Sequence, residues 1–267
     1  MATPTLEQIA TAAQASGQRR GDADIAAVAA LLAEPARARI VLALADGRAL
    51  PASTLAAEAG IAPSTASSHL GRLLDGGLVQ VLPQGRHRYY RLAGESVGEL
   101  VEALARLAPP APIRSLREGT RAQALRAGRT CYDHLAGHLG VALFAGMIER
   151  GWVSGGDGRH DLSGAVRDRL SAPGRDLDYR LTPAGRRALG SSLGLELADP
   201  GRGDGTLALR YCVDWTEQRH HLSGAVGRAL AARLFELGWV RRLPRGRAVK
   251  LTDTGRRELG ELLGLAG

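Results

Sequence analysis

Cysteine and histidine side chains recur twice in the second half of this 267-residue chain, in a pattern that suits a metal ion. Thiolate and imidazole are the ligands that zinc and other borderline cations prefer. In the first set the spacing is i, i+3 and i+7, so the three side chains would share one face of a helix if residues 130–143 were helical. The candidate metal ligands are Cys131, His134, His138, Cys212, His220 and His221.

Two other interpretations of this region stay open. A small organic effector could bind between the two sets, where Trp215 offers an aromatic surface that has no counterpart in the first set. Alternatively the region holds no ligand, because buried cysteines and helix-capping aspartates are ordinary features of protein cores. The candidate effector-binding residues are Cys131, Asp133, His134, Cys212, Asp214, Trp215 and His221.

The same residue types could also form a catalytic thiol site. Three neighbours on one helix, such as Cys131, Asp133 and His134, rarely give the nucleophile, base and orienting group their geometry, which normally draws on separate elements. The sequence also lacks a glycine-rich phosphate loop and the H-E-x-x-H and G-x-S-x-G motifs. We therefore expect that the protein is not an enzyme.

The segments that carry the two sets resemble each other. Arg129-Thr-Cys-Tyr-Asp133 matches Arg210-Tyr-Cys-Val-Asp214. His134-Leu-Ala-Gly137 matches His221-Leu-Ser-Gly224 when residues 215–220 are set aside as an insertion. Each copy closes with Leu-Thr-x-x-Gly-Arg-Arg, so the similarity extends over the whole second half.

This self-similarity and the chain length predict two domains. We expect an effector domain over residues 120–267, built from two winged-helix-like repeats at about 120–197 and 208–265. A linker at 108–119 separates it from the N-terminal domain, residues 1–107, because three prolines in four positions cannot continue a helix.

The charge and the absence of targeting signals narrow the class of protein. The net charge is +8 with a pI of about 10.4, and the basic excess lies after residue 110, which suggests a polyanionic partner. No apolar run approaches the roughly 20 residues of a membrane-spanning helix, and the N-terminus has no export signal. Two cysteines cannot form a disulfide framework. These features predict a cytoplasmic protein with no membrane partner.

Residues 25–92 predict a helix-turn-helix followed by a β-hairpin. Gly60 ends one short helix, and Pro63 opens the next, which runs to about Asp75. A hairpin that turns at Gly85 follows and completes a winged helix. The predicted fold class is therefore mainly α with small β (α+β), with an N-terminal winged helix-turn-helix.

The helix that begins at Pro63 has two faces. Ala66, Leu70 and Leu73 suit a core, whereas the opposite face carries short hydroxyl side chains that can bind base edges or phosphates in a major groove. Arginine at the hairpin tip can enter the adjacent minor groove. The candidate DNA-binding residues are Ser64, Thr65, Ser67, Ser68, His69, Arg72, Arg86, His87 and Arg88.

Four motifs give residues 22–107 a resemblance to the ArsR family of winged-helix repressors. The motifs are Pro35-Ala-Arg-Ala-Arg-Ile40, Leu55-Ala-Ala-Glu-Ala-Gly60, Ser64-Thr-Ala-Ser-Ser-His-Leu70 and Gly85-Arg-x-Arg-x-Tyr90. The resemblance implies a homodimer that binds a palindromic operator in double-stranded DNA and leaves it when an inducer binds. The second half is similar to the duplicated C-terminal extension of a long subgroup.

The family's usual metal sites are absent. Many relatives bind metal through cysteine in the first helix of the helix-turn-helix, or through aspartate and histidine on the last helix of the domain. Here residues 54–59 contain no cysteine and residues 97–107 contain no histidine. A metal effector would therefore have to bind elsewhere in the chain.

Two functions remain for the N-terminal domain. The helices at 25–33 and 97–107 carry more apolar surface than one such domain needs, which predicts a dimer interface for reading a symmetric operator. The alternative is a ligand-binding or scaffold protein that uses its winged helix for protein contacts. The polar helix face favours DNA, because a protein-binding face is more often apolar. We predict a dimeric transcriptional repressor whose C-terminal domain senses a small molecule or a metal.

Overall fold

The structure is a computed structural model that describes residues 23–85, 87–109, 112–113, 115–160, 177–197, 205–244 and 246–265. Arg86, a candidate DNA-binding residue, lies outside these ranges. Helices dominate, and the strands of the described residues form small sheets of two or three strands each. The predicted class, mainly α with small β, is confirmed.

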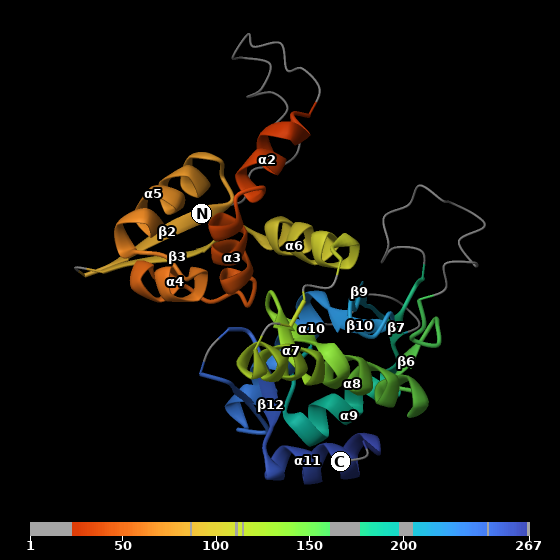
Figure 1. The fold of residues 1–267 in the computed structure, drawn as a ribbon. Helices are drawn as coiled ribbons and strands as arrows, with labels where there is room; N and C mark the ends of the chain where they lie inside the picture. The colour runs from red at the N-terminus through yellow and green to blue at the C-terminus, as the bar shows by residue number, and fades with distance from the viewer. Residues whose placement is uncertain are drawn as a thin grey trace.

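The N-terminal half is a helix-turn-helix with a wing. Its helices are α2 (Ile25–Leu32), α3 (Pro35–Leu44), α4 (Ala52–Ala59), α5 (Pro63–Asp75) and α6 (Glu95–Leu107). Its strands are β1 (Leu50–Pro51), β2 (Val79–Gln84) and β3 (His87–Leu92), which form an antiparallel sheet in the order β1-β3-β2. The β2–β3 hairpin is the wing, and it extends beyond the helices, away from the C-terminal half (Figure 1).

Local sequence sets the turn between α4 and α5. Gly60 ends α4 in a left-handed conformation, φ +70°, which glycine adopts without a steric cost from a Cβ. Pro63 lies in the first turn of α5, where its missing N–H would have no helical partner. The N-cap residue is Ala62, whose side chain accepts no hydrogen bond. Leu55 and Leu70 are buried between the two helices and α3.

The C-terminal half repeats one order of elements. Its helices are α7 (Leu116–Ala127), α8 (Gly137–Glu149), α9 (Pro183–Leu193), α10 (Gly224–Glu236) and α11 (Asp253–Leu263). Its strands are β4 (Arg129–Cys131), β5 (His134–Ala136), β6 (Val153–Ser154), β7 (Arg180–Leu181), β8 (Leu207–Ala208), β9 (Arg210–Val213), β10 (His220–Ser223), β11 (Val240–Arg242) and β12 (Val249–Leu251). The order β4-β5-α8-β6-β7-α9 is followed, after β8, by β9-β10-α10-β11-β12-α11.

Two local expectations differ from the structure. Residues 130–143 do not form one helix, because residues 129–136 form the β4–β5 hairpin and α8 begins only at Gly137. Gly137 has φ +72°, a value that lets the chain turn sharply from strand to helix. In addition, α7 begins at Leu116, so the end of the expected linker is helical.

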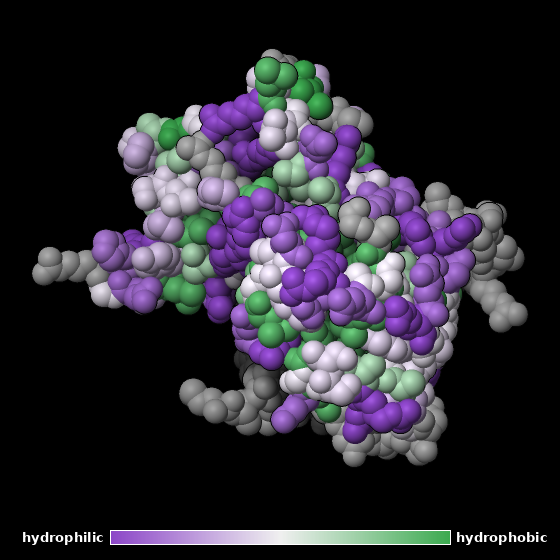
Figure 2. All heavy atoms as spheres, turned by 90° about the horizontal axis from the view of Figure 1, so that it is seen from below, coloured by the Kyte–Doolittle hydropathy of each residue, from purple (hydrophilic) through white to green (hydrophobic). Residues whose placement is uncertain are grey.

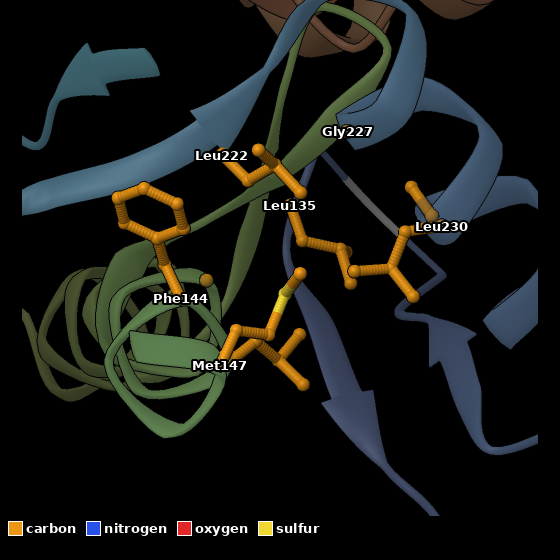
Figure 3. Close-up of a pocket in the computed structure, with 9 residues that line it drawn as sticks. Leu135, Phe144, Met147, Leu222, Gly227 and Leu230 are labelled. Carbon is orange, nitrogen blue, oxygen red and sulfur yellow. The ribbon is translucent and has the colours of Figure 1, made fainter. Parts of the chain in front are cut away.

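The two copies in the C-terminal half pack on each other. Helix α8 of the first copy contacts β10 of the second, and α10 of the second contacts β5 of the first. Leu135, Phe144, Met147, Leu222 and Leu230 point toward one another between them (Figure 3). They leave a hollow of only about 10 Å³, which has room for about one water molecule.

The two halves of the chain meet at α6 and at the end of α3. The backbone N–H of Tyr132 donates to the carbonyl oxygen of Ala45, at 2.8 Å, just after α3. The buried Arg247 guanidinium forms an ion pair with Glu102 of α6. The N-terminal half therefore contacts the same β4–β5 turn that separates Cys131 from His134.

The outer surface is predominantly polar on the side seen in Figure 2, where hydrophobic residues lie in small groups between hydrophilic ones. The wing projects from this body as an arm, as in Figure 1. Among the helices of the described residues, none combines the length and the apolar character that crossing a membrane requires.

Candidate functional site

Helix α5 presents one buried and one exposed face, as predicted. Ala66, Leu70 and Leu73 are buried against the N-terminal core. The other face is solvent-exposed and polar, and its exposed candidate residues are Ser64, Thr65, Ser67, Ser68 and Arg72. Ser67 Oγ donates to the carbonyl oxygen of Pro63, at 3.1 Å, so its hydroxyl is partly engaged by its own helix.

The remaining candidates of the N-terminal half differ in exposure. His87 and Arg88 are exposed on β3, close to the wing tip. His69 is half-buried, and its Nε2 lies 3.6 Å from Glu34 Oε2, which ties α5 to the start of α3. His69 is therefore positioned as much for packing as for contact with a phosphate.

Apolar side chains are exposed on the two helices that were expected at a dimer interface. No residue of α2 is buried in the single chain, and Ile25 is 76% exposed. On α6, Leu104 and Leu107 are exposed, Leu107 to 83%. Large apolar side chains that stay exposed are typical of a surface that another chain covers.

In the C-terminal half, two hairpins each place a cysteine opposite a histidine. The register pairs Cys131 with His134 in the β4–β5 hairpin and Cys212 with His221 in the β9–β10 hairpin. Directly opposed residues of an antiparallel pair project from the same face, with Cβ atoms about 4.5–5.5 Å apart. Each hairpin thus presents one sulfur and one imidazole together.

The two pairs meet in one cluster. The possible ligand atoms of Cys131, His134, Cys212 and His221 all lie within 4.8 Å of one another. Two glycines let each helix pack closely on a hairpin of the cluster. A Cβ at Gly227 would lie 2.7 Å from the Leu222 carbonyl oxygen and 3.3 Å from the Cβ of His134. A Cβ at Gly140 would overlap the Leu135 carbonyl oxygen, while its contact with the Cβ of His221 would be an ordinary one. We call these four residues the Cys₂His₂ cluster.

The imidazoles of the cluster are buried and incompletely hydrogen-bonded. His134 Nδ1 lies 3.2 Å from Asp133 Oδ1, while its Nε2 has no hydrogen-bond partner. Neither ring nitrogen of His221 has a hydrogen-bond partner, although Nδ1 lies 3.5 Å from Asp214 Oδ2. An aspartate therefore stands beside each histidine, and at least one nitrogen of each ring is free.

The protonation of the cluster is uneven. The neighbouring Cys131 thiol and the nearby imidazoles of His134 and His221 lower the pKa of Cys212 in spite of its burial. The approach of Cys212, together with burial, raises the pKa of Cys131. Burial opposes protonation of His134, but Asp133 and Cys212 outweigh it and raise its pKa to about 9. Of the two thiols, Cys212 is therefore the one that loses its proton more readily.

Asp214 anchors the cluster to the rest of the domain. Its Oδ2 accepts hydrogen bonds from Arg129 Nη2, at 3.0 Å, and from the Gly137 N–H, at 2.7 Å, where α8 begins. Burial alone would raise the pKa of Asp214, but Arg129, His221 and these hydrogen bonds lower it to about 2. The carboxylate is therefore charged and joins both copies.

The other candidates of the C-terminal half lie outside the cluster. His138 is an exposed residue of α8, with Nδ1 3.4 Å from Glu217. His220 is the strand neighbour of His221 and points to the opposite face, where its Nδ1 lies 2.9 Å from the Tyr179 hydroxyl. Trp215 stacks on the Arg129 guanidinium, whose Cζ lies 4.5 Å from the ring centre. Four of the six candidate metal ligands thus come together, and two do not.

A cavity of about 780 Å³ separates α6 from the cluster. Cys131, His134 and Cys212 line it on the side of the C-terminal half, and Glu99 and Arg106 line it on α6. The Tyr132 ring contacts α6 at the same place, since a Cβ at Gly98 would lie 3.2 Å from it. The cluster therefore borders a hollow that lies between the two halves of the chain.

Several residues of this interface were not among the sequence candidates. They are Tyr132, Glu102, Arg129 and Arg247. Tyr132 has φ +57°, unusual for a residue with a Cβ, and it occupies the turn between two paired residues. Arginine recurs at positions 129 and 210 of the two copies, which could have marked Arg129 as a candidate. This recurrence does not indicate that Glu102 lies close to Arg129.

The fold and the exposed polar helix define a winged helix-turn-helix protein of the DNA-binding class. Residues 32–81 match a family model described as "Helix-turn-helix domain". The chain is 38% identical over 233 residues to the uncharacterized HTH-type transcriptional regulator YdfF of Bacillus subtilis. The aligned region covers 87% of this chain and 94% of YdfF.

Two further matches cover only part of the chain. The HTH-type transcriptional regulator CmtR of Mycobacterium tuberculosis is 42% identical over 77 residues, which are 27% of this chain and 64% of that protein. A homodimeric winged helix-turn-helix DNA-binding domain from Mycobacterium bovis, a possible ArsR-family regulator, is 33% identical. It covers 40% of this chain and 88% of that one, at a TM-score of 0.29.

The chain belongs to the family of HTH-type transcriptional regulators that includes YdfF, and its N-terminal half has the winged helix-turn-helix fold. Its relatives are named as regulators and not as enzymes, in agreement with the prediction from sequence. The family membership extends beyond the winged helix, because the YdfF match includes most of the C-terminal half.

Proposed function

We propose that the protein is a homodimeric repressor that binds a palindromic operator through α5 and the wing, and that its C-terminal half controls this binding. The exposed hydroxyl and arginine face of α5 is the observation that carries the proposal. Ser64, Thr65, Ser68 and Arg72 would read base edges in the major groove. His87 and Arg88, with Arg86, would contact the backbone or the minor groove. Such a protein acts in the cytoplasm, as expected from the sequence.

Dimerisation would use α2 and α6. Ile25, Leu104 and Leu107 offer apolar surface that the single chain leaves exposed. A symmetric operator requires two reading helices in a fixed relation, so a dimer interface on helices adjacent to the winged helix suits this function.

The contacts of the C-terminal half with α6 support a regulatory role. Tyr132 packs on Gly98, and Arg247 forms an ion pair with Glu102. Gly98 and Glu102 both belong to α6, the helix that would form the dimer interface. A shift of the β4–β5 turn would therefore displace α6 and change the distance between the two reading helices. Regulation of this kind is a coupling free energy between an effector site and the DNA site.

Selection of bound fragments from random duplex DNA tests the DNA-binding part. The full-length protein is expected to enrich a palindrome. The alternative, a scaffold that uses the winged helix for protein contacts, predicts no enrichment. The same duplex is then used to measure affinities of variants in the α5 face.

A further inference from the structure

We infer that Cys131, His134, Cys212 and His221 bind one borderline divalent cation, for which Zn²⁺ is the natural probe. The ligand set is two sulfurs and two imidazole nitrogens, a combination that zinc binds as a tetrahedral centre in many proteins. The chain contains two cysteines in all, and both belong to this cluster. The site deepens the proposed function, on which it rests, because it names the effector class of the C-terminal half.

The geometry is close to that of an ion-binding site. Tetrahedral zinc with bond lengths of about 2.0–2.3 Å places its ligand atoms roughly 3.3–3.8 Å apart. The ligand atoms of the cluster lie within 4.8 Å of one another, so contraction by at most about 1–1.5 Å at any pair would close them on an ion. Short side chains on two neighbouring hairpins can make such a movement without unfolding.

The buried histidine nitrogens point independently to a ligand. His134 and His221 are both at least nine-tenths buried, and His134 Nε2 and both His221 nitrogens have no hydrogen-bond partner. A buried polar group without a partner costs about 1–3 kcal/mol. A cation coordinated by His134 Nε2 and by one nitrogen of His221 would satisfy these two atoms and leave the other His221 nitrogen facing Asp214.

The surroundings match the usual second layer of a zinc site. Metal-bound histidines commonly donate their other ring N–H to a carboxylate, which fixes the ring and its tautomer. Asp133 is placed to do this for His134, and Asp214 lies on the Nδ1 side of His221. The two copies of the repeat thus contribute equivalent halves, each with a cysteine, a histidine and a supporting aspartate.

Binding of an ion to the Cys₂His₂ cluster would act directly on contacts with the DNA-binding half. Cys131 and His134 flank the turn at Tyr132, whose N–H donates to Ala45 and whose ring packs on Gly98. Contraction of the cluster would pull this turn away from or toward α6. Ion binding would therefore change operator affinity, by a factor of about 5–150, the range that is typical of allosteric coupling.

The primary test is a titration of chelator-treated, thiol-reduced full-length protein with Co²⁺, followed by displacement with Zn²⁺. We expect about one ion per chain, with a thiolate-to-cobalt charge-transfer band and the intense visible bands of a tetrahedral site. Because no cysteine lies elsewhere in the chain, the charge-transfer band reports this cluster alone. Reduced protein that takes up neither Co²⁺ nor Zn²⁺ would overturn the inference.

Variants locate the site. Cys212→Ser and His221→Gln are expected to weaken Zn²⁺ binding by more than about 100-fold, and Asp133→Asn by about 10–100-fold. His138→Gln is the matched control, because His138 is an exposed histidine of the same domain that lies outside the cluster. Loss of the ion in His138→Gln, with retention in Cys212→Ser, would also overturn the inference. If a variant does not fold, the cobalt spectrum of the wild-type protein still shows whether the cluster binds an ion.

Operator binding is measured separately, so that the two proposals can fail independently. Wild-type protein that binds the operator but no metal keeps the proposed function and refutes the site. Zn²⁺ binding without any enriched DNA keeps the site and refutes the regulator. Equal operator affinity with and without Zn²⁺, in protein shown to bind both, would refute the regulatory role of the ion.

Discussion

The α5 face and the Cys₂His₂ cluster are both groups of polar side chains, but they differ in burial. Ser64, Thr65 and Arg72 are exposed on α5. The cluster lies between two hairpins and two helices, where His221 is fully buried, and it borders the cavity on the side of α6. An open face suits a large polyanion that brings its own charge, whereas a small buried group suits a single ion.

The difference also has an energetic side. Exposed hydroxyls and guanidinium groups are hydrated, so they cost the fold little when no partner is bound. Buried histidines and carboxylates must be paired inside the protein, which explains the aspartates and arginines around the cluster. Substitutions in the two regions should therefore change different properties. Those on the α5 face should change the affinity for DNA, and those in or around the Cys₂His₂ cluster should change stability or ion binding.

The largest expected effect lies on the buried side. Glu102→Ala removes the carboxylate that pairs with the buried Arg247, which leaves an unpaired charge at the interface between the halves. We expect the free energy of unfolding to fall by about 3–5 kcal/mol, measured by urea denaturation. Glu99→Ala is the control on the same helix, because its ion pair with Arg210 is exposed and should contribute under about 1 kcal/mol. Equal losses of stability in the two variants would contradict the larger contribution expected of the buried ion pair.

A charge on the exposed apolar surface should act on association. Leu107→Glu places a carboxylate on α6 where the dimer interface is proposed, and it should weaken dimerisation by about 2 kcal/mol or more. Sedimentation equilibrium gives the dissociation constant. Leu116→Glu, also at an exposed leucine but on α7, is the control. A dimer that is unaffected by Leu107→Glu would move the interface elsewhere.

On the exposed side, one arginine should matter for DNA and little for stability. Arg72→Ala is expected to weaken operator binding by about 1–3 kcal/mol if Arg72 contacts a base, while the urea midpoint stays close to that of wild type. Fluorescence anisotropy with the selected duplex measures the affinity. Arg257→Ala, an exposed arginine on α11, serves as the control. Unchanged affinity would remove Arg72 from the reading surface.

The smallest expected effect concerns the start of α5. Ala62 is the N-cap residue and offers no side-chain acceptor, so Ala62→Ser should increase the free energy of unfolding by about 0.5–1 kcal/mol. Urea denaturation can resolve this gain. A loss of stability would show that the first turn of α5 is held by something other than its cap.

The N-terminal half was predictable because its signals are local. Gly60 and Pro63 mark the turn, and the spacing of Ala66, Leu70 and Leu73 defines the buried face of α5. Each signal lies within a few residues of the element that it determines. The helix-turn-helix, the wing and the exposed face of α5 therefore follow from the sequence alone.

The residue types of the cluster were predictable, but its geometry was not. A spacing of three between Cys131 and His134 fits one face of a helix, and it also fits opposed residues on either side of a two-residue turn. The strands involved are only three residues long, too short for an alternating pattern to appear. Tyr132 has a positive φ at the first position of this turn, where glycine or asparagine is usual, so its residue type does not indicate the turn.

The charged contacts between the halves were not predictable either. Glu102 and Arg247 are 145 positions apart, and neither belongs to a recognisable motif. Only the way in which α6 lies over the C-terminal half brings them together. Interfaces of this kind depend on three-dimensional packing and leave little trace in a single sequence.

The reciprocal packing of α8 on β10 and of α10 on β5 has a consequence for biosynthesis. A nascent chain that ends before α10 would expose Leu135 and Phe144 to water, because their cover is encoded much later in the sequence. Neither copy can complete its interior by itself. Deletion of either copy would leave the apolar side chains of the other uncovered, so we expect that neither copy folds without its counterpart.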